Sequence, residues 1–255
     1  MIKNLIVLVI ALMASTSLHG QWKIDKISLG FENGIKKDFN TITQNDGGYF
    51  LPAQHNWIGS RFLLGNYYYG GNATIFLKNK FLIDFGIYSH VVSDYYIFYI
   101  PELKKGSSSS GSSPYLKFVL GFGRDIKIIG RLFFQSSILL SYTLTDNEID
   151  GDLIGNGIAL DKDYVSLDST YTYSKNNFFL GLRNTFQWKF NDRLNLNFGF
   201  SYNHGLQKFS KTNHTLYMTS APETIYKGET ISRLSHSTLF LSAQYSIWHA
   251  DKKAQ

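Results

Sequence analysis

Two alternating stretches joined by a short turn constrain the fold of this 255-residue chain more than any other feature. Between Asn177 and Leu206, apolar side chains take nearly every second position and polar side chains take most of those between. Period two indicates β-strands, because successive side chains on a pleated backbone point to opposite faces. The turn formers Asn191 and Asp192 divide the pattern into two strands. The apolar positions are Phe178, Leu180, Leu182, Phe186, Trp188 and Phe190, then Leu194, Leu196, Phe198, Phe200 and Tyr202.

These two predicted strands are too long and too two-sided for an ordinary soluble sheet. Strands in soluble proteins usually have about 5–6 residues, whereas a tilted strand needs about 9–11 residues to cross a bilayer. One face is too apolar for water, and the other is too polar for a protein core. A wall between lipid and a wet interior suits both faces.

The same alternation recurs along the chain and predicts about eight strands. Long connections begin at Asn33, Pro101, Asp146 and Ser210, and they alternate with short turns at Asn79, Asp125 and Asn191. Outer-membrane barrels show this asymmetry, with long extracellular loops and tight periplasmic turns. The Ser-rich segment within Pro101–Pro114 is interpreted as a loop tip. We therefore predict an all-β fold, a single closed antiparallel up-and-down transmembrane β-barrel. The other predicted strands are Trp22–Glu32, Trp57–Lys78, Phe81–Ile100, Tyr115–Arg124, Ile128–Thr145 and Leu234–Trp248.

The first twenty residues, Met1–Gly20, have the pattern of a signal peptide. Lys3 provides the positive start, Leu5–Met13 the apolar stretch and Ala14–Gly20 the small-residue exit. We therefore expect export to the bacterial outer membrane and a barrel domain over residues 21–255. Cys is absent, which excludes disulfides and thiolate metal sites. The net charge of +6 comes without a nucleic-acid-binding motif.

Aromatic and charged residues mark the predicted barrel's ends and interior. Trp22, Trp188 and Trp248 fall at predicted periplasmic strand ends, where an aromatic girdle at the membrane interface is expected. Opposite them, near the other rim, fall Trp57, Tyr95, Tyr96 and Tyr99. On the predicted register a polar cluster fills the lumen, with Gly86, Gly121, Gly123 and Gly199 making room for Tyr88 and Phe240. The charged members of this cluster are Lys26, Asp84, Arg131, Arg183 and Lys189.

The signal peptide, strand number, loop asymmetry and aromatic end of the last strand resemble the small outer-membrane β-barrels of the OmpA/OmpX-like group. The resemblance covers the whole mature chain but rests on pattern rather than on a signature motif. It implies insertion by the barrel-assembly machinery, which recognises a terminal aromatic residue in that group. Here Trp248 is followed by His249–Gln255, so that signal departs from the group's pattern. Members include adhesion-related, structural and enzymatic proteins.

Three functions are open to such a barrel. The favoured prediction is a structural or surface-interaction protein with a plugged polar lumen and extracellular loops as recognition sites. A narrow porin-like channel for small solutes is the second. The third is a lipid A-modifying enzyme, for which Ser235, His236 and Ser237 near the rim, a Glu32–His236 contact and a lipid-facing His204 are the candidates. However, the deacylase-type His-x-Ser pattern is missing, and adjacent strand residues face opposite sides.

Ligands other than lipid find little support in the sequence. The acidic stretch Asp146–Asp152 resembles the start of a calcium loop, but Gly157 stands where the bidentate Glu is needed. The histidines considered as metal ligands, His55, His90, His214 and His249, are scattered. We therefore predict no cofactor, metal or catalytic residue and no nucleic-acid partner. The expected state is a monomer in contact with lipopolysaccharide and phospholipid.

Overall fold

The computed structural model describes residues 23–46, 50–52, 67–100, 105–144, 153–161, 164–173 and 176–250. The predicted signal peptide lies outside these residues. No helix among them is long and apolar enough to cross a membrane. The strands are β1 (Ile24–Asn45), β2 (Phe50–Pro52), β3 (Tyr67–Leu77), β4 (Phe81–Ile100), β5 (Lys105–Ile129), β6 (Leu132–Leu144), β7 (Leu153–Asp161), β8 (Tyr164–Thr172), β9 (Asn176–Lys189), β10 (Leu194–Gly205), β11 (Ser210–Met218) and β12 (Ala221–His249).

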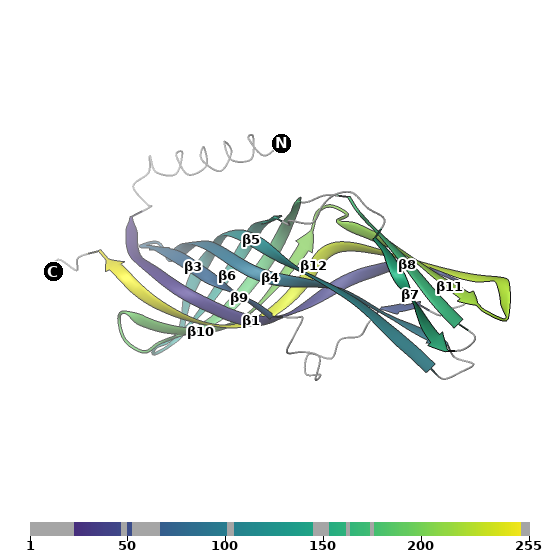
Figure 1. Ribbon diagram of the computed structural model, residues 1–255. Helices are drawn as coiled ribbons and strands as arrows, with labels where there is room; N and C mark the ends of the chain where they lie inside the picture. Colours follow the sequence, from purple (N-terminus) through teal and green to yellow (C-terminus); the bar gives the residue numbers. More distant parts are fainter. Residues whose placement is uncertain are drawn as a thin grey trace.

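Eight of the described strands form a closed antiparallel barrel, as predicted. The strand order around the wall is β1, β3, β4, β5, β6, β9, β10 and β12, and β12 then pairs with β1. The β1–β12 ladder runs from Lys26 opposite His249 to Asn45 opposite Gly228. The first and last strands therefore seal the wall. The described ends of both strands lie at one end of the barrel (Figure 1).

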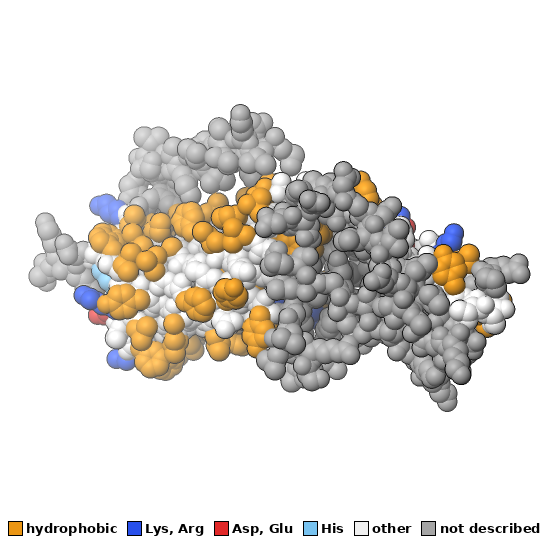
Figure 2. Space-filling view, in the orientation of Figure 1, with side chains coloured by type: hydrophobic (Ala, Val, Ile, Leu, Met, Phe, Trp, Pro, Cys, Tyr) orange, Lys and Arg blue, Asp and Glu red, His pale blue; other side chains and the backbone are white. Residues whose placement is uncertain are grey.

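Side chains are distributed inside out, with polar residues inward and apolar residues outward. Along β12, Thr238, Phe240, Ser242, Gln244 and Ser246 are buried, whereas Leu241, Tyr245 and Ile247 between them are exposed. The hairpin between Asn177 and Leu206 behaves in the same way: Gln187 and Asn195 are fully buried, and Phe186 and Phe198 are about half exposed. Figure 2 shows the outward apolar side chains spread over the barrel surface. A wall of this kind is suited to lipid outside and polar groups inside.

The short turns lie at one end of the barrel and follow local side-chain chemistry. Asn191 Oδ1 accepts hydrogen bonds from the backbone N–H of Arg193 and Leu194, at 2.8 and 2.7 Å. This is the turn-forming contact for which Asn is favoured. The turn predicted near Asp125 was misplaced. β5 continues to Ile129, and the chain reverses at Gly130, whose φ of 53° suits glycine.

The long connections differ most from the prediction, because much of their length is strand. β1 continues to Asn45, and the Ser-rich segment is not a loop tip, since β5 begins at Lys105 and pairs with β4. The loop predicted from Asp146 contains β7 and β8, and the one from Ser210 consists of β11 and the outer half of β12. Beyond the membrane, neither face of a strand must be apolar, so the alternation that marks membrane strands disappears while backbone pairing continues.

The extra strands extend the barrel wall outward on one side. β11 pairs with the outer half of β12, β8 pairs with β11, and β7 pairs with β8. This extension projects from the end opposite the short turns (Figure 1). Leu234 marks the junction: its φ is 57°, and there β12 exchanges its partner β10 for β11. At this bulge the side chain of Leu234 points inward, while the β1–β12 ladder continues.

A polar clip joins three strands of this extension. Lys211 Nζ lies 2.6 Å from Glu229 Oε2, and Thr43 Oγ1 donates a hydrogen bond of 2.7 Å to Glu229 Oε1. The hydrogen bond from Lys211, aided by that from Thr43, lowers the pKa of the Glu229 carboxyl. The clip therefore contributes fully above the ordinary pKa of a glutamate and is lost as pH falls through the lowered value.

Inward glycines make room for large interior rings, as predicted for Gly86 and Gly199. A Cβ on Gly86 would collide with the ring of Tyr88, and one on Gly199 would collide with Phe240. The Gly199 position would also bring a Cβ within 2.7 Å of the Asn184 carbonyl oxygen, which belongs to the barrel backbone. Side-chain rotation alone cannot relieve that contact.

We therefore expect Gly199→Ala to lower the stability of the barrel by about 1–3 kcal/mol, the usual cost of overpacking. Urea unfolding of the protein in detergent, followed by tryptophan fluorescence, measures this change. Gly71→Ala is the matched control, because the nearest atom to its Cβ, the Gly30 carbonyl oxygen, is 3.9 Å away. Equal effects of the two substitutions would contradict the proposed packing.

Candidate functional site

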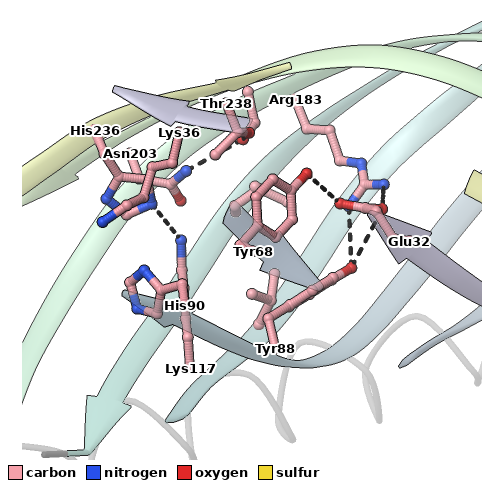
Figure 3. Close-up of a pocket in the computed structure, with 13 residues that line it drawn as sticks. Glu32, Lys36, Tyr68, Tyr88, His90, Lys117, Arg183, Asn203, His236 and Thr238 are labelled. Carbon is pink, nitrogen blue, oxygen red and sulfur yellow. Dashed lines mark hydrogen bonds and ion pairs between the residues drawn. The ribbon is translucent and has the colours of Figure 1, made fainter. Parts of the chain in front are cut away.

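The centre of the barrel interior is organised around Glu32 on β1. This carboxylate is 2% exposed and forms an ion pair with Arg183 on β9 across the lumen. Tyr68 donates a hydrogen bond of 2.8 Å to Glu32 Oε1. Tyr88 and Asn72 donate longer ones, of 3.4 and 3.3 Å, to Oε2. Donors from three strands, β3, β4 and β9, thus meet on one buried carboxylate of β1 (Figure 3).

Aromatic and aliphatic side chains fill the space around this ion pair. The Arg183 guanidinium lies over the Phe240 ring, 4.1 Å from its centroid. The rings of Tyr68 and Tyr88 meet edge to face with centroids 5.8 Å apart. These rings pack with Val119 and Leu139 in one buried cluster. We call the set Glu32, Arg183, Tyr68, Tyr88 and Phe240 the central layer.

A basic chamber lies on the extracellular side of the central layer. Lys36 Nζ pairs with Asp38 at 2.8 Å, and Lys117 Nζ lies 2.9 Å from His236 Nε2. Lys36, Lys117 and His236 line a cavity of about 30 Å³ together with His90 and residues of the central layer. Beyond it an apolar layer, Tyr115, Phe179, Phe209 and Leu234, crosses the lumen. The cavity is of the size of one or two water molecules.

The lumen on the other side of the central layer is polar and widens. Asp84 accepts hydrogen bonds from Thr74 at 2.7 Å and Ser137 at 3.3 Å. Towards the short turns, Lys189 lies 3.8 Å from Asp125. Asp125, Lys26 and Lys189 help to line a cavity of about 620 Å³ at this mouth. We call this cavity the lower vestibule.

The structure brings most of the predicted interior charges to the lumen, but in separate groups. Arg183 is in the central layer, Asp84 lies on the side of it towards the short turns, and Lys26 and Lys189 are at the lower vestibule. Arg131 was misplaced: it is exposed at the β5–β6 turn, where it donates a 2.8 Å hydrogen bond to the Phe190 carbonyl oxygen. The misplacement follows from the misplaced turn, which put Arg131 within a strand.

Glu32 is the main residue of the interior that sequence reasoning assigned to the wrong place. It was expected at the extracellular end, in contact with His236. The register instead puts Glu32 opposite Ser242 and His236 opposite Asp38. Because β1 runs on to Asn45, Glu32 lies in mid-strand. Its even-numbered position, shared with the inward residues Ser28 and Lys36, was the signal that it faces the lumen.

Two of the three predicted girdle residues can be located. Trp188 lies next to the end of β9 and Trp248 next to the end of β12, and both are exposed on the outer surface. Trp22 lies outside the described residues, as does Trp57. The side chains of Tyr95, Tyr96 and Tyr99 are also outside the description. Exposed tryptophans at strand ends are typical of a membrane interface.

Ser235 and His204 meet near the predicted extracellular rim. Ser235 Oγ lies 3.4 Å from His204 Nδ1 and also accepts a 3.0 Å hydrogen bond from the Gly205 N–H. No carboxylate among the described residues contacts this histidine. His236, by contrast, points into the basic chamber. The described residues thus supply two members of an acyl-transfer constellation without the orienting acid.

Metal ligands do not gather within the described part of the chain. No group of three or more His, Asp or Glu side chains there is arranged to hold a metal ion. The acidic stretch Asp146–Asp152, which was compared with a calcium loop, lies outside the described residues, so this finding does not apply to it. Gly157 lies in β7, where the side chains of the neighbouring residues are not described.

The inside-out wall decides the class of protein. A closed sheet with apolar side chains outward leaves no unpaired edge and no polar belt in contact with hydrocarbon. The fold is that of a small outer-membrane β-barrel. The membrane-spanning part of the barrel is the region of the outward apolar side chains, and the β7–β8–β11 extension lies beyond it.

Comparisons with known proteins give matches in structure only. No protein-family model and no curated protein matches the sequence. Neisserial surface protein A has 7% identity and a TM-score of 0.44, covering 88% of this chain and 99% of its own. The outer membrane protein OprG from Pseudomonas aeruginosa has 9% identity and a TM-score of 0.43, covering 90% and 99%. Similarity at this level transfers no activity to the barrel.

We expect Arg183→Met to destabilise the barrel by about 3–5 kcal/mol, because it leaves the buried Glu32 carboxylate without its cation. The double variant Glu32→Gln/Arg183→Met should lose less than the sum of the single changes, which urea unfolding can measure. Arg131→Met is the matched control at an exposed turn. Additive effects of the two single changes would show that Glu32 and Arg183 are not coupled.

Proposed function

We propose that the protein is a structural and surface-interaction barrel of the outer membrane with a closed lumen. The observation that carries this proposal is the central layer, where Glu32 and Arg183 join across the lumen between packed aromatic rings. The cavity beside it, about 30 Å³, is small for a solute path. The apolar layer of Tyr115, Phe179, Phe209 and Leu234 adds a second obstruction.

The extracellular extension supports a role in recognition. Strands β7, β8 and β11 continue the sheet beyond the barrel, and β4 and β5 pair as far as Ile100 and Lys105. A surface held by backbone ladders costs less conformational entropy on binding than a free loop does. The barrel would act as the membrane anchor of this surface. Its proposed partners in the membrane are lipopolysaccharide and phospholipid around a monomer, with the barrel-assembly machinery acting during insertion.

A narrow channel is the second candidate, and the lower vestibule is the observation that favours it. That cavity of about 620 Å³ is lined by charged residues of both signs, including Lys26, Lys189 and Asp125. Solutes entering it would still have to pass the central layer. The two functions therefore differ in whether Glu32 and Arg183 separate under working conditions.

Conductance across a planar bilayer distinguishes the two. We expect the wild-type barrel to show no steady single-channel steps. Tyr88→Ala/Phe240→Ala should show them only when Phe179→Ala and Phe209→Ala are added, because the central layer and the apolar layer both obstruct the lumen. The matched control is Tyr202→Ala/Phe198→Ala, which removes the same ring types from the outer surface, where both are exposed. Steady steps from the wild-type protein would overturn the closed lumen.

We assign the barrel no catalytic role, and lipid A is the substrate that tests this. The mass spectrum of lipid A from cells with and without the gene should show the same acyl pattern, since the Ser235–His204 contact has no orienting carboxylate among the described residues. If the gene changes the acyl pattern and Ser235→Ala abolishes that change, the protein would instead be an acyl-transfer enzyme acting at the rim.

A further inference from the structure

The basic chamber has a cation whose charge no carboxylate balances directly. Lys117 is 7% exposed, and its Nζ contacts His236 Nε2 and lies 5.2 Å from the centre of the Phe179 ring. No carboxylate among the described residues lies within ion-pair distance of it. Buried charges in proteins are normally paired, because desolvation is costly. This lysine therefore points to a missing counter-charge.

The carboxylates nearest to Lys117 are already engaged. Asp38 pairs with Lys36, and Glu32 is held by Arg183, Tyr68, Tyr88 and Asn72. Asp84 lies on the opposite side of the central layer and binds Thr74 and Ser137. None of these groups can turn to Lys117 without breaking another buried contact.

His236 does not supply the negative charge either. Its Nδ1 lies 2.7 Å from the Leu234 carbonyl oxygen, an acceptor, so Nδ1 carries the proton and donates it. Nε2 is then the lone-pair atom that accepts a hydrogen bond from Lys117. The imidazole is neutral in this arrangement. One N–H of Lys117 is used, and the others remain for a ligand.

A second observation at the same cavity indicates a ligand independently. His90 is 2% exposed, and its Nε2 has no hydrogen-bond partner in the described structure. The ring is fixed between Tyr115 and His236, with centroid distances of 5.8 and 5.5 Å. Figure 3 shows His90 beside Lys117 in the wall of the cavity that both line. A buried polar nitrogen without a partner is uncommon and requires an explanation.

We propose that the basic chamber binds one small monatomic anion of the halide class, held by Lys117 Nζ and by the Nε2–H of His90. The cavity of about 30 Å³ sets the size limit. It has room for a particle or two of the size of water, which suits chloride or bromide better than the larger phosphate or sulfate. The anion would balance Lys117 and occupy the unpaired nitrogen of His90 at the same time. The proposal does not depend on the closed lumen, because a chamber on the extracellular side of the central layer can hold the anion whether or not solutes pass that layer.

Bromide provides a direct test because it is visible by anomalous scattering. The protein is folded and crystallised in sodium bromide, so that the ion can enter before the interior closes. An anomalous peak between Lys117 Nζ and His90 Nε2 in the wild type, absent in Lys117→Met, is the expected result. Density without an anomalous signal there would mean water and would overturn the proposal.

A solution experiment tests the same site through stability. At equal ionic strength, sodium chloride should raise the unfolding midpoint of the wild-type barrel relative to sodium gluconate, whose anion is too large for the cavity. Lys117→Met should abolish this difference. Lys227→Met, which removes an exposed lysine of the extension, should retain it. A chloride response that survives in Lys117→Met would place the ion elsewhere and reject the site.

Discussion

The closure of the sheet between β1 and β12 is the constraint on which the rest of the structure depends. A strand edge in hydrocarbon would leave N–H and C=O groups without any hydrogen-bond partner, at a cost of several kcal/mol for each. The ladder from Lys26–His249 to Asn45–Gly228 removes that edge along the full length of the first strand. Once the wall is closed, alternate residues must face a common interior, and the chemistry of the lumen follows.

Closure at eight strands leaves an interior that side chains can fill, and the chain fills it in layers. The Glu32–Arg183 pair is tenable there because tyrosines and an asparagine supply the remaining hydrogen bonds and Phe240 packs on the guanidinium. Gly86 and Gly199 leave the space that the rings of Tyr88 and Phe240 occupy. Polar specificity and steric fit are thus two aspects of one interior arrangement, and the basic chamber is its extracellular neighbour.

The same long strands connect the membrane part to the extracellular part. β12 pairs with β10 within the barrel and with β11 beyond it, and the positive φ of Leu234 marks the exchange of partners. The inward turn of Leu234 places it in the apolar layer with Tyr115, Phe179 and Phe209. A single bulge therefore redirects the sheet and at the same time places Leu234 in this apolar layer.

The sequence by itself determined the membrane wall, because period two over bilayer length leaves only one arrangement for residues such as Phe186 and Phe198. It also determined which side of the wall Lys26, Asp84, Arg183 and Lys189 would face, since strand alternation is local. Only the tertiary structure decided the rest. Strand lengths outside the membrane carry no apolar signal, so the course of β1 past Glu32 was hidden. The contact of Glu32 with Arg183, 151 positions away, could not be predicted without that register, because it depends on closure of the whole barrel.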